Sequence, residues 1–316
     1  MSEMNQVTTK VIKRKNYLFD DYDYEATYLN HLENLSESFV DSVFTTTRYR
    51  VSYMTKTIQA GNQFEVEIYP VFKYSRDLPE GIVLNKKETR KTQKNLNDKN
   101  SRKKVTRLVH ANFSEGDYWA TFTFRDEYLP NGLKDMKVIR EKFFRKINRL
   151  RKRKGLENAK YIYVEEEGTY GTERFHLHVI MDHELTKEEV ESKWEHGRVN
   201  IRTINYYGDE SLRGLCTYIT KDPETYKKTA FRVKGGRTWG RSKGNLKDPI
   251  ERKNKTKFTK KKVQEMAKHR DGIGELLEKA YPNRQFKEVE VRYNDYNGLF
   301  YIYAIMHDKR NIKSRR

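Results

Sequence analysis

The middle of the chain, residues 118–221, alternates between two kinds of apolar periodicity, and this succession constrains the fold more than any other feature of the sequence. Apolar residues at every second position predict a strand, and apolar residues at every third or fourth position predict a helix. The elements predicted in this way are a strand over 118–125, a helix over 134–153, strands over 160–166 and 174–182, a short helix over 186–195, a strand over 198–204 and a helix over 209–221.

The predicted order is therefore βαββαβ with one further helix. Thr186 and Glu189 form a capping-box pattern at the start of the short helix, and Asp222-Pro223 would end the last helix. This order is typical of an α+β fold with a ferredoxin-like split-βαβ sheet. We expect the helices to pack on one face of the sheet and to leave the other face free for a functional site.

The two ends of the chain are expected to add to this core. The predicted elements there are a hairpin over 48–58 and 63–73, a basic helix over 98–110, a helix over 259–280 and a second hairpin over 286–293 and 299–306. Residues 224–257 are basic and poorly periodic. We expect an N-terminal extension over 1–112, one catalytic domain over 113–225, and a basic segment, helix and hairpin over 226–316 that pack on the core.

The net charge of +20 is concentrated in three segments. Residues 86–107 carry 10 basic and 2 acidic side chains, residues 134–154 carry 11 and 2, and residues 221–262 carry 16 and 4. Such segments attract polyanions, so nucleic acid is the expected partner and an anionic membrane surface is the alternative. No segment approaches the roughly 18–20 apolar residues of a membrane span. The single Cys216 excludes a disulfide framework and a multi-cysteine zinc site, which fits a reducing, cytoplasmic location.

His176 and His178 are two positions apart on a predicted strand, so both imidazoles project from the same face. They can share one divalent ion, which needs a third ligand. The preceding strand ends in Glu165, Glu166 and Glu167, and a tight connection would make the two strands antiparallel neighbours. Two imidazoles and a carboxylate suit Mg²⁺ or Mn²⁺ assisted by phosphate oxygens. The alternative is that the three glutamates form a solvated strand end.

Tyr218 and Lys221 are three positions apart on the last predicted helix and share a face. That helix can lie beside the sheet face that carries the histidines. A tyrosine close to a metal-bound phosphate is a candidate nucleophile. Its unperturbed pKa is about 10, so a cation such as Lys221 or the metal ion would be needed to favour the phenolate. The alternative is that Tyr218 packs at the edge of the helix.

Taken in this order, three motifs resemble those of the HUH endonucleases, and more closely those of the rolling-circle replication initiators of phages and plasmids. Residues 118–124, YWATFTF, resemble the first motif of the family. Residues 175–181, FHLHVIM, resemble its histidine motif, and residues 218–221, YITK, resemble its third motif. The resemblance covers residues 118–222, and residues 234–249 are also similar to members of this group.

The resemblance implies roles for individual residues. His176 and His178 would be metal ligands, and Tyr218 would be the nucleophile with Lys221 as its companion. The family's glutamate lies on the strand before the histidines, and we place Glu166 first and Glu167 second. The candidate DNA-binding residues are Arg145, Arg149, Arg174, Arg237, Trp239, Arg241 and Lys243. The turn before Tyr218 has Gly214 where some initiators carry a second tyrosine, so a single-tyrosine enzyme is expected.

The implied function is that of a divalent-metal-dependent DNA endonuclease and strand transferase that starts rolling-circle replication. It would bind single-stranded or hairpin origin DNA and become linked to the 5′ end through Tyr218. A host polymerase would extend the released 3′-OH and a host helicase would unwind the duplex, in the cytoplasm of a bacterial host cell and without a membrane. A relaxase or a single-tyrosine transposase would share this chemistry. A non-catalytic DNA-binding protein is the alternative from another class.

Overall fold

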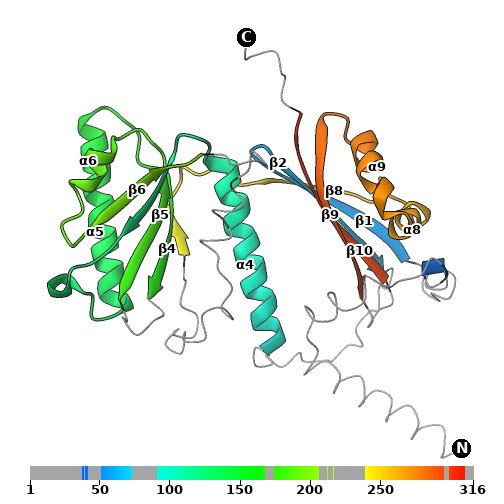
Figure 1. Cartoon of the computed structure of the whole chain (residues 1–316), viewed down its shortest axis with the longest axis horizontal. Helices are drawn as coiled ribbons and strands as arrows, with labels where there is room; N and C mark the ends of the chain where they lie inside the picture. The colour runs from blue at the N-terminus through cyan, green and yellow to red at the C-terminus, as the bar shows by residue number, and fades with distance from the viewer. Residues whose placement is uncertain are drawn as a thin grey trace, which may run out of the picture. The chain divides into compact units, whose positions relative to one another are not determined.

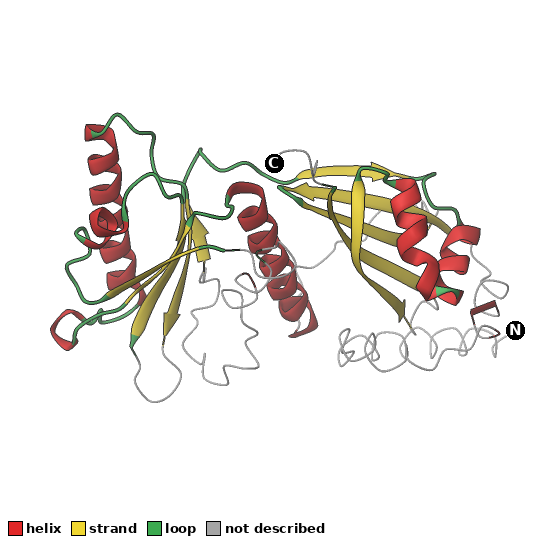
Figure 2. Cartoon of the chain, turned by 45° about the horizontal axis from the view of Figure 1, so that its top comes forward, coloured by secondary structure: helices red, strands yellow, loops and turns green. Residues whose placement is uncertain are grey.

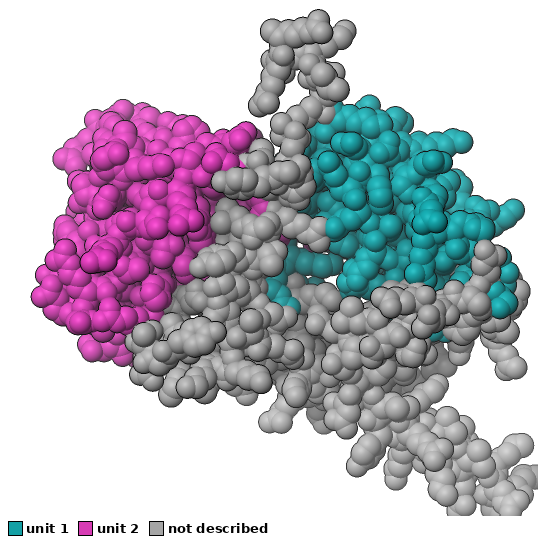
Figure 3. All heavy atoms as spheres, in the orientation of Figure 1, with its two compact units in different colours: residues 1–103, 250–316 teal, residues 104–249 magenta. Residues whose placement is uncertain are grey.

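The computed structural model describes residues 38, 40–41, 51–72, 91–167, 174–205, 212, 216, 239–294 and 299–309. The chain forms two compact units (Figure 3). The central unit comprises residues 104–249, and the terminal unit comprises residues 1–103 together with 250–316. The chain thus passes between the units at 103–104 and 249–250, whereas the sequence division placed boundaries at 112–113 and 225–226.

The central unit contains a five-stranded antiparallel sheet with the order β6-β3-β5-β4-β7. Its strands are β3 (Tyr118–Phe122), β4 (Tyr161–Glu167), β5 (Phe175–Met181), β6 (Val199–Thr203) and β7 (Trp239–Arg241). Because β5 pairs antiparallel with both β3 and β4, those two strands run in the same direction with β5 between them. This is the split-βαβ arrangement, and the α+β class predicted from the sequence is confirmed.

Helices α5 (Leu133–Arg153) and α6 (Lys187–Glu191) cover one face of this sheet (Figure 1). On α5, Met136, Phe143 and Ile147 recur at helical spacing and form the apolar stripe that meets the strands. The capping box predicted for α6 is confirmed: the Thr186 hydroxyl accepts from the Glu189 N–H, and the Glu189 carboxylate accepts from the Thr186 N–H. The strand residues buried in this cluster are Ala120, Phe122, Phe175, Leu177, Val179 and Met181.

The opposite face carries His176 and His178, and we call it the histidine face. Helix α4 (Lys91–Asn112) covers one end of it, because its apolar residues are buried there. Of the helix predicted over 209–221, the structure describes Leu212 and Cys216, and both belong to the same cluster. The full cluster comprises Val105, Leu108, Val109, Phe113, Ile162, Ile180, Ile204, Leu212 and Cys216. The histidine face is therefore only partly available, and the expectation of a wholly free face is corrected.

The terminal unit contains a second five-stranded antiparallel sheet with the order β8-β1-β2-β10-β9. Its strands are β1 (Val51–Ala60), β2 (Gln63–Phe72), β8 (Ile250–Asn254), β9 (Arg284–Asn294) and β10 (Leu299–Asp308). The two predicted hairpins, from opposite ends of the chain, join through β2 and β10. Helices α8 (Lys260–Lys268) and α9 (Ile273–Ala280) lie on one face of the sheet (Figure 2). Their buried residues Val263, Met266, Ile273 and Leu277 pack there with Phe64, Val66, Phe300 and Ile302.

Several predicted elements differ from the structure. The single helix expected over 259–280 is wrong, because α8 ends at Lys268 and a 3₁₀ turn over Arg270–Gly272 separates it from α9. His269 leaves the helical region with φ −109° and ψ 75°, and Gly272 is a weak helix former. The first strand ends at Phe122 instead of residue 125. The segment 224–257, expected to be irregular, contains β7 and β8.

Within the described residues, no helix combines the length and the apolar character that crossing a bilayer would require.

Candidate active site

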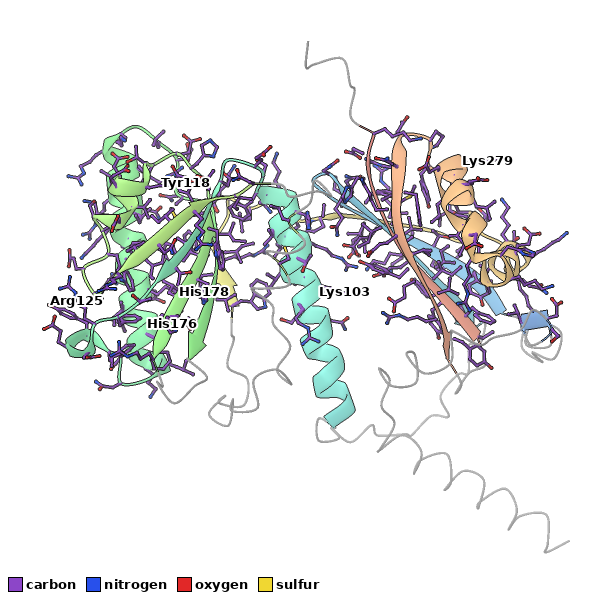
Figure 4. All side chains as sticks on the ribbon, in the orientation of Figure 1. Lys103, Tyr118, Arg125, His176, His178 and Lys279 are labelled. Atoms are coloured by element: carbon purple, nitrogen blue, oxygen red, sulfur yellow. The ribbon has the colours of Figure 1, made fainter. Side chains whose placement is uncertain are left out.

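His176 and His178 both lie on β5, the central strand of the split-βαβ sheet, and project from the histidine face (Figure 4). Their ring centroids are 6.4 Å apart and the ring planes differ by 23°. His178 is buried with 6 % exposure, whereas His176 is half-buried. The two imidazoles are thus close enough to act on one ligand at the edge of a partly covered surface.

Two residues of the neighbouring strand β3 fix the ring of His178. The Thr121 hydroxyl lies 3.1 Å from Nδ1, and the Trp119 ring stacks flat on the imidazole at 5.2 Å between centroids. With Nδ1 engaged by Thr121, His178 would bind a metal ion through Nε2. A partner on the second ring nitrogen is what orients metal-binding histidines and sets their tautomer.

The strand register separates the three consecutive glutamates of β4. Glu166 is the direct cross-strand partner of His176, while Glu165 and Glu167 pair with Leu177 and Phe175. Because side chains alternate along a strand, Glu166 takes a position on the histidine face and its two neighbours take positions on the α5 face.

Glu165 has a structural partner on the α5 face. Its carboxylate pairs with Arg140 of α5, and the Arg140 guanidinium lies 4.2 Å from the centroid of the Tyr163 ring. Burial raises the pKa of Glu165, and the charge of Arg140 acts in the opposite direction. The pair ties the end of β4 to α5 and so holds the strand whose next residue is Glu166.

The donor set of the histidine face fits a divalent metal ion in its chemistry. His176 and His178 supply imidazole nitrogens, and the register position of Glu166 supplies a carboxylate beside them. A mixed nitrogen and oxygen set of this kind accommodates Mn²⁺ or Mg²⁺. Among the side chains that the structure describes, no three His, Cys, Asp or Glu residues gather into a complete metal cluster.

Cys216 ties the segment before Tyr218 to the histidine face. It is 1 % exposed, and its cluster includes Ile162 of β4 and Ile180 of β5. Burial raises the pKa of its thiol to about 12. Tyr218 and Lys221, the candidate nucleophile and its companion, lie outside the described residues, as does Arg237.

The remaining candidate DNA-binding residues fall on different surfaces. Trp239 and Arg241 pair with Val164 and Ile162 on the histidine face, and Arg241 also pairs with Asp248 at 2.8 Å. Arg145 and Arg149 are exposed on α5, which covers the opposite face. Arg174, just before β5, pairs with Asp126, and Lys243 is exposed after β7. The structure therefore brings only Trp239 and Arg241 to the face with the histidines.

Sequence reasoning missed three residues of this face, Arg198, Asn200 and Arg202. All three are exposed; Arg198 immediately precedes β6, and the other two lie on β6 in register with β3. The stretch RVNIRTI at 198–204 alternates polar and apolar residues, so the signal was present in the sequence. It predicted a strand, but which face would be solvated depends on where α5 and α6 pack.

The comparisons with known proteins bear on this unit. The family model of the replication-associated protein ORF2 matches residues 117–223. The matched span begins just before β3, contains the two histidines and ends after Lys221. Neither the comparison with curated proteins nor the comparison with solved structures found a match. The family match supports a role in replication initiation.

Proposed function

We propose that this chain initiates rolling-circle replication by nicking single-stranded origin DNA through a covalent phosphotyrosine. The observation that carries the proposal is the register of β4 on β5, which sets Glu166 opposite His176 on the face that His178 shares. This arrangement lies within the span similar to replication-associated proteins. The nicking chemistry, the metal requirement and the covalent bond are parts of the proposal.

The nucleophile in this proposal is Tyr218. The chain limits its position, because two residues span at most about 7 Å and Cys216 is buried against the histidine face. The tyrosine oxygen would attack the phosphorus, forming a P–O bond to the 5′ side and breaking the bond to the 3′ oxygen. The phenol loses its proton and the 3′ oxygen gains one. One phosphodiester replaces another, so the same bond exchange in reverse rejoins the strand without ATP.

The other residues would prepare this attack. His176, His178 and Glu166 would hold a Mg²⁺ or Mn²⁺ ion, which polarises a phosphate and offsets the charge that develops on it. Thr121 and Trp119 hold the His178 ring in place. Lys221 would favour the phenolate of Tyr218, since a nearby cation lowers the pKa of an acidic group.

The partners follow from the products of the reaction. The substrate would be single-stranded or hairpin origin DNA, and the released 3′-OH would be extended by a host polymerase. A host helicase would supply the unwound strand. A cytoplasmic bacterial setting is the corresponding location.

A covalent-adduct experiment tests the proposal. The purified protein is incubated with Mn²⁺ and a pool of random single-stranded oligonucleotides, and the adduct is digested and located by mass spectrometry. Wild-type protein should yield a nucleotide on Tyr218, and Tyr218→Phe should bind the pool equally well but form no adduct. An adduct in Tyr218→Phe would rule out Tyr218 as the nucleophile.

The metal assignment is tested in the same assay. A His176→Ala/His178→Ala variant should form no adduct with any concentration of Mn²⁺, and unchanged adduct formation would refute the metal site. If wild-type protein binds DNA yet never forms an adduct, the chain is a non-catalytic DNA-binding protein. Sequencing of the cleaved ends gives the preferred site, which is what separates an initiator from a relaxase or transposase of the same chemistry.

A further inference from the structure

The edge strand β6 and the residue before it present three polar side chains on the histidine face. Asn200 pairs with Thr121 of β3, which in turn pairs with His178 of β5. Arg198 and Arg202 stand two positions before and after Asn200, so all three project from the same face. We call these three residues, Arg198, Asn200 and Arg202, the β6 strip. Since neighbouring strands are about 4.8 Å apart, Asn200 is about 10 Å from His178 across the sheet.

The two arginines of the β6 strip carry charges that no described carboxylate neutralises. Both residues are exposed, and neither forms an ion pair with any residue in the described part of the chain. Other arginines of the same unit differ: Arg140 pairs with Glu165, Arg151 with Asp182 and Arg241 with Asp248. The strip is therefore a part of this face where positive charge is offered to an outside partner.

We propose that the β6 strip holds the phosphates of single-stranded DNA beside the nicking site. The inference rests on the proposed function, because it names the surface that would guide the strand to the histidines. Arginines attract phosphates through charge and can donate two parallel hydrogen bonds to them. Along a strand, alternate residues are about 6.7 Å apart, so Arg198 and Arg202 are about 13 Å apart and would contact different phosphates of one extended strand.

The geometry favours this surface over the basic helix α5. Helix α5 carries more positive charge, but it packs on the sheet face opposite the histidines. DNA held on the exposed side of α5 would be separated from His176 and His178 by the helix and the sheet. DNA on the β6 strip lies on the same surface as both histidines.

Binding measurements with matched charge changes test the inference. The probe is a fluorescein-labelled oligothymidylate, and its affinity is measured by fluorescence anisotropy in EDTA, where no metal-dependent nicking occurs, between about 50 and 200 mM salt. Arg198→Gln/Arg202→Gln should bind about tenfold more weakly, and its plot of log affinity against log salt should be shallower by about 1.4. Lys152→Gln/Arg153→Gln, exposed at the end of α5, removes the same charge on the opposite face and should retain the wild-type slope.

The outcomes separate this inference from the proposed function. If Arg198→Gln/Arg202→Gln has the slope of the wild type, or if Arg145→Gln/Arg149→Gln loses more slope than it does, the β6 strip is not the phosphate surface. That result leaves the adduct on Tyr218 untouched. If the β6 variant loses its slope while wild-type protein forms no adduct, the nicking proposal is wrong and the phosphate surface stands. Wild-type circular dichroism of each variant shows that an altered slope does not come from unfolding.

Discussion

Glu165, Glu166 and Glu167 are adjacent in the sequence, but the strand turns them to alternate faces of the sheet. Glu165 is bound to Arg140 on the α5 side. Glu166 occupies the position opposite His176. The sequence motif alone did not separate Glu166 from Glu167, because a shift of one residue in an alignment exchanges the two faces. The register of β4 on β5 favours Glu166.

We predict that Glu166→Gln weakens Mn²⁺ binding and that Glu167→Gln does not. Glutamine keeps the size of the side chain but removes the charge that a hard cation requires. Changes in residues that only orient ligands cost about 10- to 100-fold in metal affinity, so the loss of a ligand should reach the upper end of that range. Isothermal titration calorimetry with Mn²⁺ measures the affinity without requiring nicking. Weaker binding by Glu167→Gln with unchanged Glu166→Gln would place the ligand on the other residue.

At the scale of elements, the start of β6 depends on a close approach between two backbones. A Cβ on Gly197 would lie 2.2 Å from the carbonyl oxygen of Thr123 and 2.9 Å from the Cα of Phe124. That carbonyl also accepts a hydrogen bond from the indole of Trp194 at 2.9 Å. Because both contacts are with backbone, β6 would have to move away from β3 to admit a side chain.

Gly197→Ala should therefore lower the free energy of unfolding of the central unit by about 2 kcal/mol, which is typical of an overpacked site. The control is Thr203→Ala, an exposed change at the other end of β6, which should alter it by less than about 1 kcal/mol. Urea unfolding followed by tryptophan fluorescence measures both, since Trp194 lies beside the altered contact. Equal stability of the two variants would show that the chain relaxes at Gly197 at no cost.

The segment that precedes the candidate nucleophile is anchored by Cys216. The thiol is buried, and its pKa is raised to about 12, so both access and ionisation oppose reaction. We predict that a disulfide reagent at pH 8 leaves Cys216 unmodified in the native protein and modifies it fully in denaturant. The sequence has only this cysteine, so the released thiolate reports on one site. Rapid reaction in the native state would show that the segment does not stay packed on the histidine face.

The sequence predicted those elements whose signals are local. Alternating residues marked β3 to β6, and Thr186 with Glu189 marked the start of α6. Three features depend on distant partners and were not predicted. The register of β4 on β5 selects Glu166, the apolar side of α4 covers part of the histidine face, and β2 pairs with β10 from the other end of the chain. The break at Gly272 was missed because the apolar periodicity continues through it.

At the scale of the whole molecule, each unit has its own hydrophobic core. One buried cluster draws only on residues of the terminal unit, and two draw only on residues of the central unit. Separate cores are what allow parts of a chain to fold as distinct domains. The family match covers most of the central unit and none of the strands of the terminal unit.

Two matched substitutions should reveal whether the cores are independent. All three tryptophans, Trp119, Trp194 and Trp239, belong to the central unit, so their fluorescence reports on that unit alone. Phe300 in the terminal core is 0 % exposed, and Phe143 in the central core is 2 % exposed with its ring 5.4 Å from that of Trp194. Phe to Ala in a core costs about 3–5 kcal/mol. Phe143→Ala should shift the fluorescence transition in urea, whereas Phe300→Ala should shift only the transition seen by circular dichroism. Equal shifts of the fluorescence transition by both variants would show that the two cores unfold as one cooperative structure.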